Sequence, residues 1–168
     1  MHDTNLFKNL YGMLGEGKLD RAKFFAMLCR TLVQEVGCTR ASFWFYSGTL
    51  QDNLICEGLY DAGDGQWSSG MSLIEDDHPE YFEAMRDERI IVASDARTYP
   101  ATAGFSETYL EPLNIYSTLC AAIELDGSPL GLVCCENSAQ IKVWSQQDLQ
   151  YLQQAAAMVG LAMKKFGG

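Results

Sequence analysis

The sequence predicts an α+β fold in which one antiparallel sheet is covered on both faces. The first observation is the order of elements: two helical segments, strands interrupted by short helices, a hairpin and a long last helix. The second is the strand-like stretch "RASFWFYSG" (40–48), in which Phe43 and Phe45 point to one face while Trp44 and Tyr46 point to the other. Large apolar groups on both faces indicate a strand that is buried on both sides. The third is the dipeptide Asp126-Gly127 between two apolar runs, a strong hairpin signal.

Length, charge and cysteine placement narrow the class of protein. A chain of 168 residues is the usual size of one domain with its own core. The formal net charge of −10 argues against nucleic acid, whose binding requires a basic face, and equally against an anionic membrane surface. The first residues lack the pattern of a signal peptide, and no apolar run approaches the ~20 residues that span a bilayer. Most cysteines lie within apolar segments, where reduced cysteine is common, so we expect a cytoplasmic protein.

Two helices are expected before the first strand. In "NLFKNLYGML" (5–14), Leu6 and Leu10 recur at helical spacing. The second helix is expected to begin after Asp20, a suitable N-cap, and to end at Gly37, a suitable C′ residue. The chain is accordingly divided into an N-terminal helix within residues 1–18, with an expected dimer contact, and a single domain over residues 19–166.

The middle of the chain alternates strands with turns. The stretch "NLICEGLY" (53–60) is strand-like, and residues 64–77 read as a loop with one short strand. Asp77 is expected to cap a short helix, since Glu80 follows three residues later.

A further strand, "RIIVASDA" (89–96), leads into a turn-rich loop that contains Pro100. Ser106 is expected to cap a short helix that stops near Pro112. The strands 116–125 and 129–137 then flank the Asp-Gly turn.

The last helix has the clearest start. Ser145 and Asp148 form a capping box, and Trp144 with Leu149 is placed for a hydrophobic staple. Beyond them the apolar residues form two adjacent stripes, so the helix has two surfaces to bury, one against the sheet and one against a partner helix. The residues expected at a dimer interface through the terminal helices are Leu6, Leu10, Leu149, Leu152, Val159 and Met163.

The order of these elements and the residues at their joints resemble the GAF domain family over about residues 19–166. The matching segments are "IIVASDA", the Pro-containing loop with "ETYL", the hairpin "NIYSTLCAAI-x-x-DG-x-PLG", and "WSQQDLQYL" at the last helix. The resemblance implies a GAF/PAS-like twisted antiparallel sheet of five or six strands. It implies terminal helices on one face, loops and short helices over a small-molecule pocket on the other, and a homodimer formed through the terminal helices.

Candidate ligand contacts are polar or aromatic residues at strand ends and under the expected lid, since ligand pockets are mainly apolar with a few converging polar groups. Asp95 could instead form a turn and pair with Arg97, and this alternative stays open. The expected pocket residues are Trp44, Tyr46, Asp95, Arg97, Tyr109, Ser117 and Cys120.

The adjacent cysteines Cys134 and Cys135 point to opposite faces of their strand. A reactive thiolate requires a nearby cation or helix N-terminus, and the surrounding "LGLVCCEN" offers only a carboxylate. We therefore interpret both as core residues. Cys120, on the partner strand of the hairpin, is the more plausible oxidation partner.

Several specific ligands are not supported by the residues. The branch of GAF proteins that reduces methionine sulfoxide carries a cysteine in the segment corresponding to residues 98–110, which has none here. The Asn-Lys pair of cyclic-nucleotide-binding GAF domains and the Cys-His pair of bilin-binding ones are also absent from the sequence. His78 beside Asp76 and Asp77 is interpreted as solvated surface, not as a metal ligand, because metal sites need several converging ligands. The cofactor is thus unknown, and no metal is expected.

The leading hypothesis is a non-catalytic cytosolic sensory domain that binds a small ligand and signals through its terminal helices to an output domain or a partner protein. Two alternatives stay open: a dimerisation or interaction module with a filled pocket, and a cysteine-based redox enzyme or switch. The terminal Gly167-Gly168 would end a helix, which favours a free-standing protein over a piece of a longer one.

Overall fold

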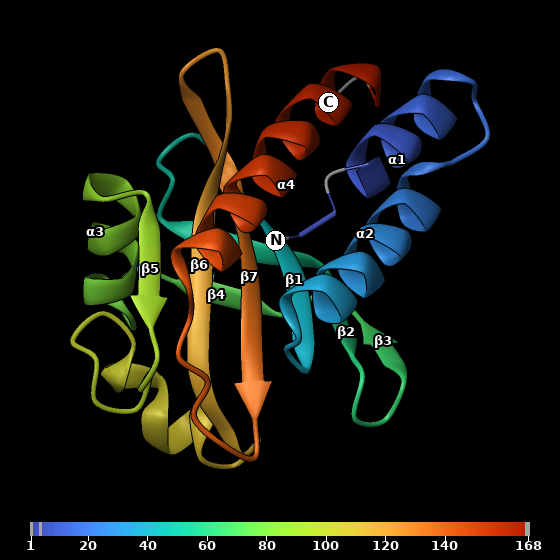
Figure 1. Ribbon diagram of the computed structural model, residues 1–168. Coiled ribbons are helices and arrows are strands. Elements are labelled where there is room, and N and C mark those ends of the chain that lie inside the picture. The colour runs from blue at the N-terminus through green and yellow to red at the C-terminus, as the bar shows by residue number, and fades with distance from the viewer. Residues whose placement is uncertain (1, 4, 167–168) are drawn as a thin grey trace.

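The computed structural model describes residues 2–3 and 5–166. Its centre is a single antiparallel sheet with the strand order β3-β2-β1-β7-β6-β5, in which β4 pairs with the other end of β2 (Figure 1). In chain order the elements are α1 (Asn5–Gly15), α2 (Arg21–Val36), β1 (Arg40–Tyr46), β2 (Asn53–Asp61), β3 (Gln66–Ser68), β4 (Ser72–Ile74), α3 (Pro79–Asp87), β5 (Ile90–Ala93), the short turns η1 (Ala103–Phe105) and η2 (Ser106–Leu110), β6 (Ile115–Leu125), β7 (Ser128–Ser138) and α4 (Gln146–Lys165). The sheet has seven strands, not five or six, because residues 64–77 contribute two three-residue strands.

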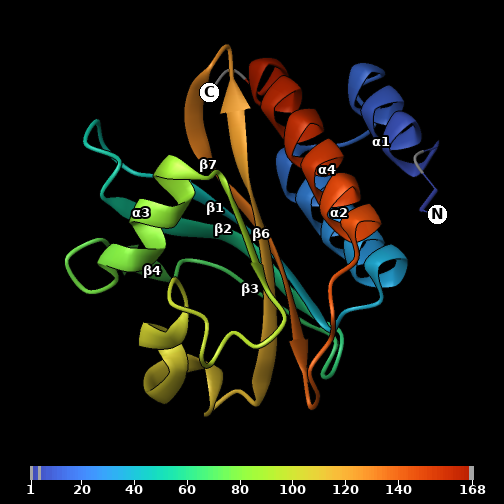
Figure 2. The same cartoon turned by 60° about the vertical axis from the view of Figure 1, so that its left-hand side comes forward.

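The two faces of the sheet are covered differently. Helices α1, α2 and α4 lie together on one face, while α3 and the turns η1 and η2 lie on the other (Figure 2). Each face has its own cluster of buried apolar side chains. The α+β class and this division of layers confirm the fold predicted from the sequence.

Strand β1 separates the two cores as its alternating aromatic residues predict. Phe43 and Phe45 pack in the cluster beneath the helices, whereas Trp44 and Tyr46 pack in the cluster on the opposite face. The same alternation divides the adjacent cysteines of β7, since Cys135 belongs to the helix side and Cys134 to the other. Each central strand therefore contacts both layers.

The helix ends follow the capping signals in the sequence. The Asp20 carboxylate accepts the Lys23 N–H at 2.9 Å, and Gly37 ends α2 with φ of 75°. At the start of α4, the Ser145 hydroxyl accepts the Asp148 N–H while the Asp148 carboxylate accepts the Ser145 N–H, both at 3.0 Å. Both predicted caps are confirmed.

Two expected caps on the other face are wrong. Helix α3 begins after His78, with no side-chain cap, because Asp77 lies in the preceding turn. Ser106 does not cap a helix either: its hydroxyl donates to the Glu111 carboxylate at 2.7 Å, at the junction of η1 and η2. A capping pattern in the sequence cannot fix where a short helix starts when loop contacts decide it.

The expected dimer seam is part of the chain's own core. Leu152 and Val159 are 0% exposed, and Leu10 and Met163 are nearly as well covered. Leu6 and Leu149 are only partly buried. Both stripes of α4 are covered within one chain, because α1 and α2 pack against the side of α4 that the sheet leaves open. The prediction that these buried leucine, valine and methionine side chains meet a second chain is therefore corrected.

Helix α4 ends at Lys165, and Gly167-Gly168 lies outside the described residues. None of the helices within residues 5–166 is both long and apolar enough to cross a membrane.

Candidate functional site

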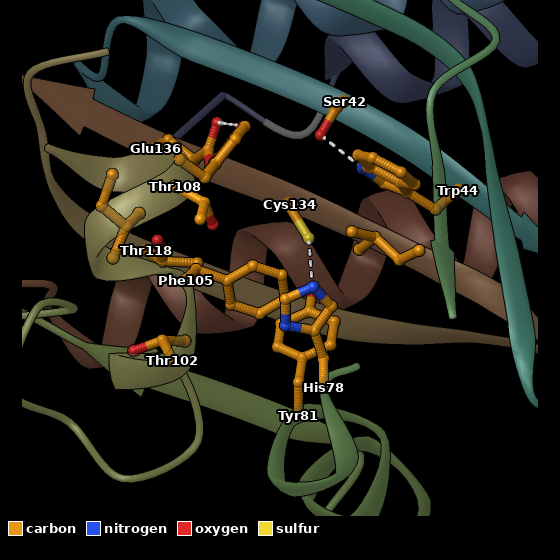
Figure 3. A pocket seen from close by; sticks show the side chains of 13 residues that line it. Ser42, Trp44, His78, Tyr81, Thr102, Phe105, Thr108, Thr118, Cys134 and Glu136 are labelled. Atoms are coloured by element: carbon orange, nitrogen blue, oxygen red, sulfur yellow. Dashed lines mark hydrogen bonds between the residues drawn. The ribbon is translucent and has the colours of Figure 1, made fainter. Parts of the chain in front are cut away.

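A cavity of about 160 Å³ lies between the sheet and the segments that cover its second face (Figure 3). The sheet supplies one wall, made by β1, β6 and β7 through Ser42, Trp44, Thr118, Cys134 and Glu136. The covering segments supply the other wall, which we call the lid, through His78, Tyr81, Thr102, Phe105, Thr108, Tyr109 and Leu110, and Leu73 of the sheet strand β4 completes the lining. The site is thus framed by strands that also contact the helices.

The strand register brings the polar residues of the sheet wall together. Ser42 on β1 lies opposite Cys134 on β7, and Thr118 on β6 lies opposite Glu136 on β7. Cys134 and Glu136 are two positions apart on β7, so both face the cavity. The Trp44 indole N–H donates to the Ser42 hydroxyl at 2.9 Å, which fixes the ring against this wall.

The lid presents stacked aromatic rings. The His78 imidazole lies on the Phe105 ring with centroids 3.9 Å apart and planes 17° apart, and Tyr81 meets Phe105 edge-on at 5.1 Å. Burial lowers the pKa of His78, which favours the neutral imidazole. Its Nδ1 atom is covered and has no hydrogen-bond partner among the described residues, so water or a bound molecule has to supply one. His78 is therefore half-buried against the lid and is not the fully solvated residue that the sequence led us to expect.

A buried charged cluster closes one end of the cavity. Arg40 donates to the Glu136 carboxylate at 3.0 Å and to the Asp61 carboxylate at 2.8 Å. The Tyr109 hydroxyl accepts from Arg40 at 3.2 Å and donates to Glu136 Oε1 at 2.9 Å. Burial and the neighbouring Glu136 carboxylate raise the pKa of Tyr109, so its hydroxyl remains a donor. The Arg40 guanidinium thus pairs with the carboxylates of both Glu136 and Asp61, so the cluster has one more negative than positive charge.

Between the sheet wall and α3, on the cavity face of the sheet, three polarisable groups meet. The Cys120 and Cys134 sulfur atoms are 2.6 Å apart, and the Tyr81 hydroxyl lies 3.4 Å from the first and 3.5 Å from the second. All six cysteines are free thiols and buried. Burial raises the pKa of Cys134, so the protonated thiol is favoured and its nucleophilicity is low.

The structure brings together only some of the residues expected at the pocket. Trp44 and Tyr109 line the cavity, whereas Cys120 is not a lining residue but lies beside the lining residue Cys134 on the same face of the sheet. The remaining four, Tyr46, Asp95, Arg97 and Ser117, are not among its lining residues.

Two of these outlying residues have identifiable structural contacts. Arg97 does not pair with Asp95: it donates to the Ile115 carbonyl at 3.0 Å and lies over the Tyr116 ring at 4.0 Å. The Ser117 hydroxyl donates to the Ser94 carbonyl at 2.6 Å and accepts the Lys142 N–H at 2.8 Å, so it ties strand ends together.

Sequence reasoning missed several lining residues. Cys134 and Glu136 lie two positions apart on β7, a strand that the sequence predicts. A register placing β7 beside β1 would have paired Glu136 with Arg40. His78 and Phe105 lie 27 positions apart, and nothing in either local pattern indicates that they stack. Within residues 2–3 and 5–166, no group of three or more potential ligands could hold a metal ion.

Comparisons with known proteins agree with this architecture. A profile of the GAF domain family matches residues 20–163. Among curated protein sequences, none shows significant similarity. The phycocyanobilin-bound GAF domain of a cyanobacterial phytochrome superposes with a TM-score of 0.74 at 15% identity, covering 95% of this chain and 92% of that one. The GAF domain of a phosphoenolpyruvate-protein phosphotransferase from Acinetobacter gives 0.70 at 10% identity, with 98% and 95% covered. The PixJ GAF domain of Thermosynechococcus elongatus gives 0.68 at 15%, with 98% and 90% covered.

Proposed function

Since this chain belongs to the GAF domain family, we propose that it is a non-catalytic sensory domain that binds a small molecule between its sheet and its lid. The observation that carries the proposal is the cavity itself, with aromatic residues on one side and a few buried polar groups on the other. That combination is typical of ligand sites. The alternative of an interaction module with a filled pocket is less well supported, because the side chains leave about 160 Å³ between the two walls.

A short chain of hydrogen bonds favours a signal to α4. Thr102, which lines the cavity, donates to the Ala96 carbonyl at 2.6 Å. Two residues before Ala96, the Ser94 hydroxyl accepts the Trp144 N–H at 3.3 Å, and the Trp144 indole donates to the Ala93 carbonyl at 3.3 Å. Trp144 directly precedes the capping box of α4. A ligand that prefers one position of the lid would therefore shift the population of α4 positions that an output domain or partner protein reads.

The surroundings of this protein are also part of the proposal. Six buried free thiols suit a reducing compartment, so we place the protein in the cytosol. The net charge of −10 makes nucleic acid and anionic lipid poor partners. A homodimer through the apolar stripes of α4 is not included, because the sheet and helices of one chain already cover them.

The proposal is tested by denaturing the purified protein and identifying released small molecules by mass spectrometry, together with a thermal-shift screen of the native protein. The matched control is Thr108→Trp, since Thr108 lines the mouth of the cavity yet is solvent-exposed. We expect a molecule that co-purifies with, or raises the melting temperature of, the unaltered protein and does neither with the variant. Equal binding to the folded variant, or no binding to either protein, would contradict the proposal.

A thiol switch is the second candidate, favoured by the contact between Cys120 and Cys134 on paired strands. A hydroperoxide would take two electrons from the two thiols: one S–S bond forms, the O–O bond breaks, and the two thiol protons leave in water and the reduced alcohol. After peroxide treatment, the unfolded protein would then titrate with four thiols, which is six minus two. Six thiols after treatment would exclude this candidate.

A further inference from the structure

The cavity wall contains one carboxylate oxygen, Glu136 Oε2, that no described side chain bonds. Glu136 is only 7% exposed and lines the cavity. The hydrogen bonds it receives from Arg40 and Tyr109 both end on Oε1. Among the described side chains Oε2 has no donor, so it is available to a molecule inside the cavity. Since Oε2 is not sealed off from solvent, a ligand donor replaces water there and forms a charge-assisted hydrogen bond, which is stronger than one between neutral groups.

The charges around Glu136 favour a donor and disfavour an anion. Arg40 is shared between Glu136 and Asp61, so the cluster of three groups has two negative charges and one positive charge. Of the described residues lining the cavity, none is a lysine or an arginine. His78, the remaining titratable nitrogen of the lid, has a pKa lowered by burial and stacks on Phe105 as a neutral ring. A ligand phosphate or carboxylate would therefore face a carboxylate whose one cation, Arg40, is already shared with Asp61, and no further cation lines the cavity among the described residues.

The volume of the cavity suits a ligand with one ring system. Its volume is about 160 Å³, close to the roughly 150 Å³ of an engineered cavity that holds one benzene molecule. Its lid wall is formed by Phe105, His78 and Tyr81, whose rings offer flat surfaces (Figure 3). A single aromatic ring fills such a space by stacking. A linear tetrapyrrole exceeds it, and its acidic side chains would meet the negative cluster.

From these observations we propose that the cavity binds a compact ligand with one aromatic or heteroaromatic ring and a nitrogen-bound hydrogen, neutral or cationic, that donates to Glu136 Oε2. This inference rests on the proposed function and narrows it to a ligand class. The proposal distinguishes this cavity from a site for an anionic ligand, because such a site would require a cation in its wall.

The test compares three probes that share one ring: benzylammonium, benzyl alcohol and benzoate. Binding to the full chain is measured by ligand-observed NMR and by isothermal titration calorimetry at constant salt. We expect benzylammonium to bind at least about tenfold more tightly than benzoate, because a hydrogen bond to a charged group is replaced by repulsion. Benzoate binding as tightly as benzylammonium would overturn the inference.

A matched pair of variants locates the effect. Glu136→Gln should weaken benzylammonium binding at least about tenfold while leaving benzyl alcohol nearly unchanged. Glu57→Gln removes another arginine-paired carboxylate of the sheet, which bonds Arg21 of α2 at 2.6 Å and is not a cavity residue, and should leave all three affinities unchanged. An unchanged benzylammonium affinity in folded Glu136→Gln would also overturn the inference. If that variant does not fold, the affinities of the three probes for the unaltered protein still test the inference.

The outcomes distinguish the ligand class from the proposed function. If benzoate or benzyl alcohol binds best, and Thr108→Trp abolishes that binding, the ligand class is wrong while the sensory cavity stands. If none of the probes binds, the ligand class fails, and the released-molecule experiment separately decides the proposed function.

Discussion

Asp148 shows how one side chain stabilises the junction through which we expect a signal to pass. Its carboxylate accepts the Ser145 N–H at 3.0 Å and a hydrogen bond from His2 at 2.8 Å. Burial alone would raise the pKa of Asp148, but these hydrogen bonds outweigh it and lower the pKa. The ionised form is therefore favoured in the folded protein, and it holds the first turn of α4 against the N-terminal residues.

Asp148→Asn is expected to lower the free energy of unfolding by about 1 kcal/mol at neutral pH. Because the pKa is lower in the folded state, this stabilisation is present above the ordinary carboxyl pKa of about 3.9 and is lost as the pH falls through the folded-state value. Urea denaturation at several pH values measures the effect, with Asp76→Asn, an exposed residue, as control. A difference from the unaltered protein that persists undiminished at low pH would show that the carboxylate charge is not the cause.

The cysteines provide a second prediction for single residues. Burial raises the pKa of Cys56 to about 12 and raises that of Cys29 and Cys134 as well. We expect no labelling of the native protein by a thiol reagent at pH 8 within the time in which the unfolded protein reacts at all six positions. Rapid labelling of Cys120 or Cys134 in the native protein would instead favour the thiol-switch candidate.

At the scale of elements, α4 lies so close to β6 that one position must lack a side chain. A Cβ atom on Gly160 would collide with the Glu124 carbonyl, which is backbone and cannot move aside. Gly160→Ala should therefore lower stability by at least ~1 kcal/mol, even though alanine favours helix by about the same amount. Gly12 of α1 has open space around it, so Gly12→Ala should be neutral or stabilising. Thermal unfolding compares the two, and a stabilising Gly160→Ala would mean that α4 packs less closely.

The apolar stripe of α4 supplies a second prediction at this scale. Leu152→Ala should reduce the free energy of unfolding by about 2–5 kcal/mol, because Leu152 is fully buried within the chain. Leu161→Ala, on the exposed side of the same helix, should have little effect on stability. Denaturation at several protein concentrations checks this assignment. A Leu152→Ala effect that depends on concentration would restore the idea of a seam between two chains.

These elements also show what the sequence could and could not predict. The alternation of Phe43, Trp44, Phe45 and Tyr46 requires two covered faces, so the sheet and its layers were predictable. The stripes of α4 indicate that two surfaces are buried, but a stripe does not say which helix covers it. The first helices of the chain do so, at contacts more than a hundred residues away in sequence.

The residues of the candidate site likewise fall into those that the sequence could predict and those that it could not. Trp44 and Tyr109 were accessible to reasoning because they lie on recognised elements. The stacking of His78 on Phe105 and the availability of Glu136 Oε2 depend on the path of the lid and on the side-chain geometry of a buried cluster. Such features arise only once the chain is folded, so no local pattern carries them.

At the scale of the whole molecule, the central claim is a ligand cavity on one face of the sheet that communicates with α4 on the other. The three tryptophans report on its parts separately. The Trp44 indole lines the cavity. Trp144, which lies just before α4, donates its indole N–H to the β5 strand. The Trp67 indole lies partly exposed on β3, away from both.

The most direct test is a two-dimensional ¹⁵N NMR titration of the indole N–H groups with benzylammonium, or with any molecule released from the purified protein. Saturation of the site should shift the Trp44 resonance most and the Trp144 resonance to a smaller extent, while Trp67 stays in place. A ligand that saturates the protein but leaves Trp44 unchanged, or that shifts Trp44 and leaves Trp144 unchanged, would contradict the account.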